Sequence, residues 1–197
     1  MEARTATVIL AGGRSTRMPG DKLALVIDGR TLLERAVAAA SSVSDTVVVA
    51  GPRPHWWPDD SAGVTFVVED PPFGGPVAGV AAALPRLGDV HDVLLLAGDL
   101  ADPASVVRLL CDAELAHDGV VLEDVDGMAQ PLAGRYRLAA LRAAVERLGH
   151  VRNVEVRALM RSLSLTRLPA PEPVTRNVDT PAAAHAVRAI LPRASTP

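Results

Sequence analysis

The first apolar segment of the sequence, Ala6–Leu10, is followed by residues suited to binding an anion. Two glycines and three cationic residues lie there: Gly12, Gly13, Arg14, Arg17 and Lys22. Glycine lets backbone N–H groups approach an anion closely, arginine can bind phosphate oxygens with two donors, and lysine supplies a mobile point charge. Directly after a strand, this composition predicts a polyphosphate site. A solvated basic turn is the alternative interpretation.

The spacing of these residues excludes two familiar phosphate-binding loops. The segment lacks the glycine-lysine-serine/threonine ending of a P-loop, and it does not match the G-x-G-x-x-G pattern of dinucleotide-binding domains. A plain NAD-binding domain is therefore disfavoured, also because the loop carries so many cations.

Two aspartates are candidate metal ligands. Asp99 follows the apolar run Val93–Ala97, so we expect its side chain to project from a strand end. A carboxylate there can hold Mg²⁺ while phosphates and water complete the coordination. The alternative role, the N-cap of a helix that begins near Pro103, suits Asp102 better. Asp179 is either a second metal ligand or the cap of the last helix.

Apolar segments alternate with helical patterns along the chain. Strands are predicted at Ala6–Leu10, Thr46–Ala50, Val64–Val68, Asp92–Ala97, Gly119–Leu122, Leu132–Tyr136 and Leu165–Leu168. Helices are predicted at Leu32–Ser41, Pro76–Leu84, Pro103–Ala116, Leu138–Leu148, Val154–Arg161 and Pro181–Leu191. The alternation predicts a three-layer α/β domain with a mostly parallel central sheet and helices on both faces.

Local signals support several of these elements. Thr31 and Glu34 have the spacing of a capping box, and Asp126-Gly127 is suited to turning a hairpin. In an open sheet of this kind, ligands bind outside the carboxyl ends of the strands. Four segments follow predicted strands or lie at such ends: Ala11–Lys22, Glu69–Gly79, Gly98–Pro103 and Asn177–Pro181.

The length, net charge and cysteine count limit the class of protein. The 197 residues suffice for one well-packed domain, which we expect to span residues 1–191 with a frayed tail at 192–197. A formal net charge of −3 argues against a nucleic-acid or anionic-membrane binder. The single cysteine, Cys111, excludes an internal disulfide. Because no leader pattern or spanning apolar run is present, we expect a cytoplasmic protein.

Five segments, in order along the chain, resemble the signatures of one enzyme family. They are LAGGRSTRMPGDK (10–22), EDPPFGGPVAG (69–79), LLLAGDLADP (94–103), AQPLAGRYR (129–137) and RNVDTP (176–181). Together they resemble the MobA-type nucleotidyltransferases, the molybdenum cofactor guanylyltransferases, over nearly the whole chain. The resemblance implies a Rossmann-like nucleotidyltransferase fold.

The resemblance also implies roles for individual residues. It implies that the catalytic residues are Arg17, Lys22 and Asp99 and that Asp99 binds Mg²⁺, while many relatives carry asparagine in place of Asp179, the other candidate ligand. It places the nucleotide against Leu10, Ala11, Gly12, Gly13, Arg17, Lys22, Asp70, Gly75, Gly79 and Asp99. For Asp70, an Asp-Pro turn is the alternative that the sequence itself offers.

The implied reaction is transfer of GMP from GTP to the terminal phosphate of molybdopterin or the molybdenum cofactor, with release of pyrophosphate. Cofactor-delivery proteins are possible partners. A phosphate monoester has a second pKa near about 6, so the acceptor is already mostly ionised at neutral pH. The enzyme therefore needs no general base. It must instead align two anions and stabilise the charge of the leaving group.

The sequence departs from the family pattern at three places. Pro19 stands where a glycine is expected, Leu100-Ala101 replaces methionine-proline, and Ala50-Gly51 stands where some relatives carry a base-contacting asparagine. Alternative functions are therefore the same chemistry with another base or acceptor, such as cofactor cytidylyl transfer or sugar- or alcohol-phosphate nucleotidyl transfer. A nucleotide-binding regulatory protein that has lost catalysis is a further alternative.

Other conspicuous residues have structural interpretations. Trp56 and Trp57 are expected to pack a loop, the alternative being stacking on a pterin. Cys111 lies on the apolar face of a predicted helix and is expected in the core. Arg152, Arg157 and Arg161 either face the acceptor phosphate or point to solvent.

Overall fold

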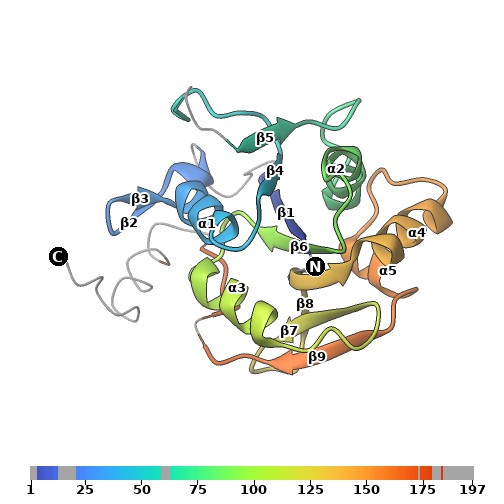
Figure 1. The fold of residues 1–197 in the computed structure, drawn as a ribbon. Coiled ribbons are helices and arrows are strands. Elements are labelled where there is room, and N and C mark those ends of the chain that lie inside the picture. Colours follow the sequence, from blue (N-terminus) through green and yellow to red (C-terminus); the bar gives the residue numbers. More distant parts are fainter. Residues whose placement is uncertain (1–3, 13–20, 59–62, 173, 179–182, 184–197) are drawn as a thin grey trace.

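The central element of the fold is a seven-stranded sheet with the order β5-β4-β1-β6-β8-β7-β9 (Figure 1). The computed structural model describes residues 4–12, 21–58, 63–172, 174–178 and 183. The strands of this sheet are β1 (Thr5–Leu10), β4 (Thr46–Ala50), β5 (Val64–Val67), β6 (Asp92–Ala97), β7 (Gly119–Glu123), β8 (Ala129–Arg137) and β9 (Leu165–Pro169).

The sheet is mostly parallel, as the sequence predicts. Strand β1 pairs in parallel with β4 and β6, while β8 runs antiparallel to both β6 and β7. The residues of β6 are buried from Asp92 to Ala97. A strand covered on both faces is expected to be apolar, and β6 is apolar from Val93 to Ala97, after the buried Asp92 at its start.

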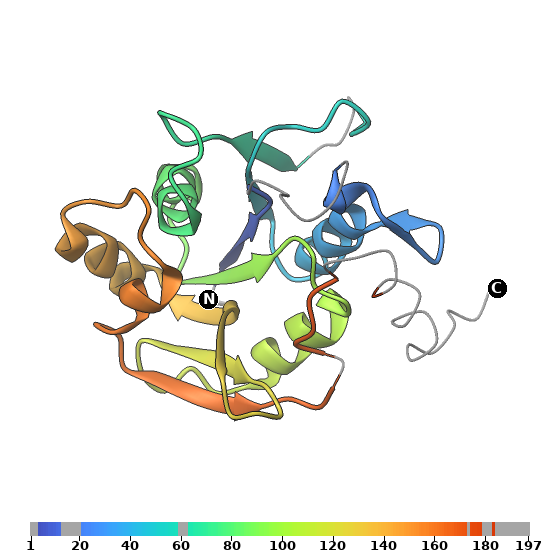
Figure 2. The same ribbon diagram turned by 180° about the vertical axis from the view of Figure 1, so that it is seen from behind.

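Helices cover both faces of the sheet and produce the predicted three layers (Figures 1 and 2). One face carries α1 (Leu32–Ser41) and α3 (Pro103–Asp112), and the other carries α2 (Pro76–Ala83), α4 (Leu138–Leu148) and α5 (Val156–Met160). Two separate apolar clusters result, because alternate residues of each strand point to opposite faces. The predicted fold class is confirmed.

The helix starts follow from side-chain caps. Thr31 and Glu34 form the predicted capping box at α1, with Glu34 N donating to Thr31 Oγ1 at 3.2 Å and Thr31 N donating to Glu34 Oε2 at 2.7 Å. Asp102 caps α3 by accepting from Ser105 N at 3.1 Å. Asp102 thus satisfies the helix start and leaves Asp99 available for another role.

Several predicted boundaries differ from the structure. The helix predicted to reach Ala116 ends at Asp112, since Ala113 is extended, and the strand predicted at Leu132–Tyr136 is longer at both ends. A small hairpin of β2 (Val26–Ile27) and β3 (Arg30–Thr31) was not predicted. Its turn residues both have positive φ, as a tight hairpin requires. Apart from Ala183, the predicted helix Pro181–Leu191 and the tail lie outside the described residues.

The predicted turn at Asp126-Gly127 is confirmed. It connects the antiparallel strands β7 and β8, and Gly127 has a φ of 75°, where glycine carries no steric cost.

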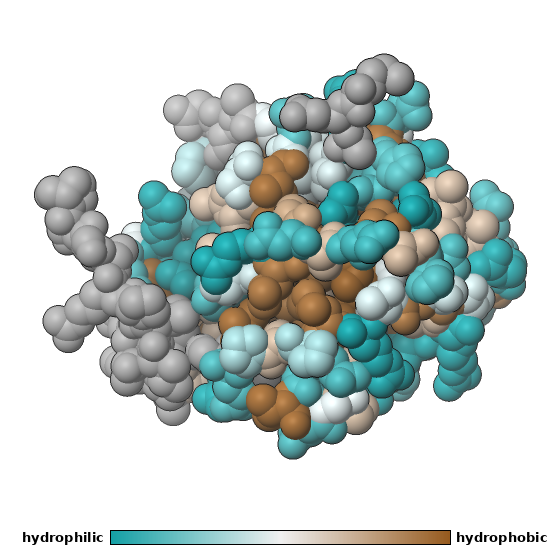
Figure 3. All heavy atoms as spheres, turned by 60° about the horizontal axis from the view of Figure 1, so that its bottom comes forward, coloured by the Kyte–Doolittle hydropathy of each residue, from teal (hydrophilic) through white to brown (hydrophobic). Residues whose placement is uncertain are grey.

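Charged residues and a proline protect the edge strand β9 from pairing with a strand of another chain. Arg167 on β9 pairs with Glu123 of β7 at 3.3 Å, and the strand ends at Pro169. Figure 3 turns this side of the molecule forward and shows apolar residues gathered in its middle, with hydrophilic residues around them.

Among the described residues, no helix combines the length and apolar character needed to cross a bilayer.

Candidate functional site

The carboxyl ends of β1, β4 and β6 meet at one side of the molecule. Leu10 O accepts a hydrogen bond from Gly98 N at 3.0 Å, and Ala11 N donates to Ala50 O at 2.9 Å. A Cβ added to Gly51 would lie 2.8 Å from the carbonyl carbon of Ala11, so only glycine fits there. The backbone around Gly12 is thereby packed directly against the end of β4.

Lys22 and Asp99 lie together at this edge. Lys22 Nζ forms an ion pair with Asp99 Oδ2. Lys22 is the first residue of the short 3₁₀ helix η1 (Lys22–Ala24), which Asp21 caps by accepting from Leu23 N at 3.0 Å. The side chains are 22% and 14% exposed, so the pair is partly shielded from water yet reachable. The structure thus brings together a cation and a carboxylate that are far apart in the sequence.

The donor set suits a hard divalent cation. Asp99 supplies carboxylate oxygens at a strand end, and the ammonium group already against it shows that positive charge is favoured there. Within the part of the chain that the structure describes, no group of three or more His, Cys, Asp or Glu residues gathers to hold a metal. A Mg²⁺ ion held by one carboxylate takes its remaining ligands from phosphates and water. The residues present therefore fit a metal that arrives with a nucleotide.

The loop before α2 is held by contacts within it and from a later segment. Glu69 Oε1 accepts a hydrogen bond from Gly74 N at 2.9 Å, and Gly74 O accepts one from Asn153 N at 2.6 Å. Asp70 precedes the cis Asp70-Pro71 bond, and its side chain is exposed. An Asp-Pro turn and an accessible carboxylate are therefore both present in this loop.

The glycines of the α2 loop have packing requirements of their own. Gly75, with a φ of 88°, is the N-cap of α2. Gly79 is buried, and a Cβ there would lie 3.1 Å from Leu10 Cδ1 and 3.4 Å from Ala50 Cβ. The missing side chain at Gly79 thus lets α2 pack closely on β1 and β4.

Three of the predicted site residues, Gly13, Arg17 and Asp179, lie outside the described residues, and so does Arg14.

A pocket of about 270 Å³ is lined by Ala97 and Leu100, which lie on either side of Asp99 in the chain. Leu100 lines it and forms a bridge with Asn177, and Asp99 O accepts from Val178 N at 2.8 Å. Leu132 and other apolar side chains form its walls. Its polar lining consists of Gln130, Glu155, Arg157, Thr175 and Asn177.

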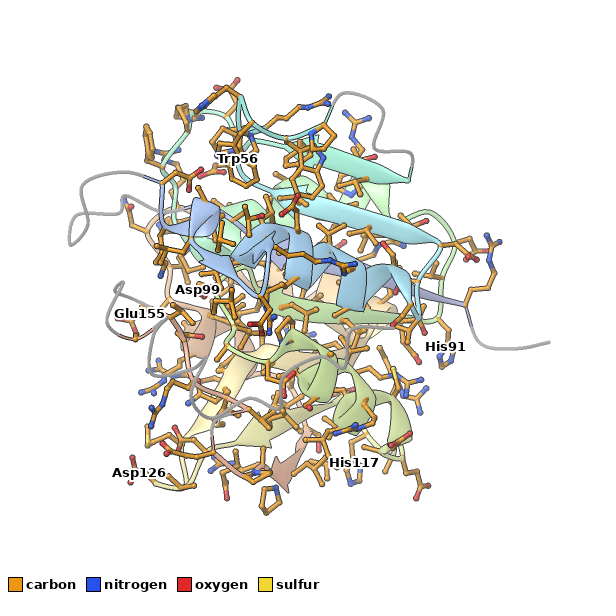
Figure 4. All side chains as sticks on the ribbon, turned by 90° about the vertical axis from the view of Figure 1, so that its left-hand side faces the viewer. Trp56, His91, Asp99, His117, Asp126 and Glu155 are labelled. Atoms are coloured by element: carbon orange, nitrogen blue, oxygen red, sulfur yellow. The ribbon has the colours of Figure 1, made fainter. Side chains whose placement is uncertain are left out.

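Of the residues that line this pocket, the sequence singled out Leu100 and Arg157 but gave no role to Gln130, Glu155, Thr175 or Asn177. They come from β8, the start of α5 and the 175–177 segment, so the pocket exists only in the tertiary structure. The available signal was the presence of Gln130 and Asn177 within two of the recognised sequence segments. Figure 4 shows Asp99 and Glu155 on the same side of the molecule.

The segment 129–137 is divided between the site and the opposite end of the sheet. Gln130 lines the pocket, whereas Arg137 donates to His117 O at 2.7 Å and Leu115 O at 2.8 Å. Figure 4 shows His91 and His117 on the side away from Asp99. Tyr136 is fully buried between these regions and donates to Pro131 O at 2.8 Å. The second half of the segment thus stabilises the fold.

The tryptophans pack a loop, as expected. Trp57 is 6% exposed and makes an edge contact with Phe66, the ring centroids lying 5.5 Å apart. Trp56 Nε1 donates to Asp21 Oδ2 at 3.1 Å, which ties this loop to the start of η1. Cys111 packs against the core of the α1 and α3 face, and burial raises the pKa of its thiol.

The three arginines of the 152–161 segment differ in position. Arg152 Nη1 donates to Pro71 O, so Arg152 supports the α2 loop rather than pointing to a phosphate or to solvent. Arg157 lines the pocket, and Arg161 is exposed.

Residues 7–168 match the family model described as a MobA-like NTP transferase domain. A molybdenum cofactor guanylyltransferase of Xanthomonas euvesicatoria is 34% identical over 167 residues, covering 82% of this chain and 80% of the relative. A probable molybdenum cofactor guanylyltransferase of Synechococcus elongatus is 41% identical over 98 residues. That match spans about half of each protein, 48% of this chain and 50% of the relative.

A solved structure shares the fold. The Mycobacterium tuberculosis protein Rv0371C, crystallised in complex with manganese, superimposes with a TM-score of 0.66 at 20% identity and covers 96% of this chain and 100% of its own.

Proposed function

We propose, on the premise that this chain belongs to the MobA-like NTP transferase family, that it transfers GMP from GTP to the terminal phosphate of molybdopterin or the molybdenum cofactor. The membership makes the chain a nucleotidyltransferase. The observation that carries the proposal is the Lys22–Asp99 pair at the carboxyl ends of the strands, next to a pocket large enough for part of an acceptor.

The nucleotide lies, in this proposal, across the segment from Leu10 to Lys22 and the loop before α2. Backbone N–H groups at Gly12 and Gly13 and the side chains of Arg17 and Lys22 bind its phosphates. Asp70, Gly75 and Gly79 belong to the part that faces the nucleoside. The exposed Asp70 carboxylate can accept from N–H donors of the base or from ribose hydroxyls.

In this proposal Asp99 would hold Mg²⁺, with Asp179 as the candidate second ligand, and the bound ion would supply charge neutralisation at the triphosphate. The acceptor occupies the pocket beside Leu100, so that its phosphate faces the α-phosphorus of the nucleotide. Lys22 stabilises the charge that develops on the transferred group and on the pyrophosphate. Aligning the two anions in one site supplies the remainder of the acceleration. Cofactor-delivery proteins remain possible partners.

The direct test is pyrophosphate release from GTP in the presence of molybdopterin. We expect Lys22→Ala and Asp99→Ala each to slow turnover by about 10²–10³, because single groups that stabilise developing charge contribute about this much. Asp102→Ala is the control, since this neighbouring carboxylate caps α3 and should affect stability more than turnover. An unchanged rate in either of the first two variants would remove that residue from the mechanism.

A second candidate is the same transfer with another nucleotide. Because a side chain at Gly51 would collide with Ala11, this chain cannot place an asparagine there without moving the backbone. Thermal-shift titrations with GTP, CTP, UTP and ATP separate the two candidates. The guanine proposal expects the largest stabilisation with GTP, and a larger one with CTP would favour cytidylyl transfer.

A further inference from the structure

Asp124 organises the turn between β7 and β8 and also holds a pocket residue. Its Oδ1 accepts from Asp126 N at 3.0 Å and from Met128 N at 2.8 Å. Its Oδ2 accepts from Gln130 Nε2 at 2.7 Å. One carboxylate therefore uses one oxygen for the backbone of the turn and the other for the side chain of Gln130.

The charge of Asp124 fixes which way the Gln130 amide faces. The hydrogen bond from Met128 N lowers the pKa of Asp124, and those from Gln130 and Asp126 and the positive charge of Arg157 act in the same direction, against partial desolvation. Asp124 is thus ionised at neutral pH and can only accept hydrogen bonds. The NH₂ group of Gln130 must face it, which leaves Oε1 as the group that Gln130 can offer elsewhere.

Gln130 also lines the pocket beside Leu100. Within the described part of the chain, Gln130 Oε1 accepts no hydrogen bond, while Met128 O is a second, weaker acceptor for its NH₂ group at 3.4 Å. The pocket is lined by Gln130 together with apolar residues that include Leu100 and Leu132. Such a surface suits a flat heterocycle whose edge carries N–H donors.

We propose that Asp124 is a positioning residue that holds the Gln130 amide so that its carbonyl oxygen accepts hydrogen bonds from N–H groups of the acceptor's ring. This inference rests on the proposed function, because it places the acceptor in this pocket. A pterin, with its amino group and ring N–H, presents such an edge. Gln130 is then the residue that selects the acceptor, and Asp124 determines that Gln130 offers its carbonyl oxygen rather than its NH₂ group.

The variant Asp124→Asn separates positioning from a structural role. Asparagine has one oxygen, and two backbone donors compete for it against one side-chain donor. The asparagine oxygen therefore continues to accept from the two backbone N–H groups of the turn, and the new NH₂ group faces Gln130. Gln130 must then turn its Oε1 toward residue 124 and its own NH₂ group into the pocket. The turn remains hydrogen-bonded, but the group offered to the acceptor changes from acceptor to donor.

We expect Asp124→Asn to raise the KM for molybdopterin by about tenfold, the cost of one mismatched hydrogen bond, without changing the KM for GTP or the melting temperature. Asp126→Asn is the matched control, with the same charge change on the same turn but an exposed side chain. The double variant Asp124→Asn/Gln130→Glu should recover the acceptor KM. Its carboxylate accepts from the new NH₂ group and still turns an oxygen into the pocket.

Equal acceptor KM values in Asp124→Asn and wild type, or no recovery in the double variant, would overturn the inference while leaving the proposed function intact. A wild-type protein that transfers nothing to molybdopterin would instead contradict the proposed function.

In that case two further measurements still decide the inference. The ¹H–¹⁵N spectrum of the wild type should show a downfield, slowly exchanging Gln130 side-chain amide proton that is lost in Asp124→Ala. Fluorescence titration with 6-hydroxymethylpterin should show weaker binding to Asp124→Asn than to wild type. A freely exchanging Gln130 amide, or equal pterin affinity, would overturn the inference.

Discussion

At the scale of single residues, the Lys22–Asp99 pair places an ammonium group on the carboxylate oxygen that a metal ion would also use. The ammonium group lies against the carboxylate that we propose for Mg²⁺. A cation that binds Asp99 must share or displace Lys22. When a triphosphate is present, it offers Lys22 another anionic partner, so nucleotide and metal are expected to strengthen each other's binding.

Lys22→Ala should therefore bind Mn²⁺ more tightly than wild type in the absence of nucleotide, although it turns over more slowly. Loss of a partly exposed ion pair predicts a gain of about two- to fivefold. Electron paramagnetic resonance titration of free Mn²⁺ measures this directly. Lys22→Arg keeps the charge and should not show the gain. Unchanged or weaker Mn²⁺ affinity in Lys22→Ala would show that the two cations do not compete.

At the scale of elements, β6 and β8 are joined by a buried ion pair at the end away from the site. Asp92 is 1% exposed, and its Oδ2 accepts from Arg135 Nη2 at 2.5 Å and Nε at 3.1 Å. His91 Nδ1 lies 2.5 Å from Asp92 Oδ1. Because both charges are largely removed from water, neither can lose its partner without a large free-energy cost.

Asp92→Asn should accordingly lower the free energy of unfolding by about 3–5 kcal/mol, since it leaves the Arg135 guanidinium without a counter-charge. Urea denaturation measures the loss. The double variant Asp92→Leu/Arg135→Leu should regain much of it, because no buried charge remains. The KM for GTP should stay unchanged, and a rise in that KM would contradict the separation of this pair from the site.

The length and sequence pattern of each element explain why some elements could be predicted and others could not. The bounds of α1, α4, β4 and β6 follow from the sequence because each has a long periodic or apolar pattern with a clear start. The hairpin of β2 and β3 has two-residue strands, which are too short to carry any period. The apolar Leu115 extends the pattern of α3 past its end, yet the chain has already turned at Ala113.

At the scale of the whole molecule, Tyr136 links global stability to pH. Burial raises the pKa of Tyr136 far above its ordinary value, and this is the only tyrosine in the chain. The folded protein therefore keeps the phenol protonated at a pH where the unfolded chain, with a pKa of about 10, loses the proton. Stability is fully present below about pH 10 and falls as the pH rises above it, by at most about 1.4 kcal/mol per pH unit from this group.

Phenolate absorbance during alkaline titration should thus appear only as the protein unfolds, in step with the loss of circular dichroism. In Tyr136→Phe the alkaline loss of stability should be less steep. That variant should be less stable at neutral pH by about 1 kcal/mol, since the hydrogen bond to Pro131 O is lost. Phenolate formation near pH 10 in a protein that remains folded would contradict the prediction.

The layered α/β fold and the positions of Lys22 and Asp99 after strands could be predicted from the sequence, because apolar periodicity and strand ends are local properties of the chain. The pairing of Lys22 with Asp99, the support of the α2 loop by Arg152 and the gathering of pocket residues such as Gln130 follow from the three-dimensional packing alone. These are side-chain contacts between segments distant in the chain. The packing of strands and helices determines these contacts, and no local sequence pattern predicts them.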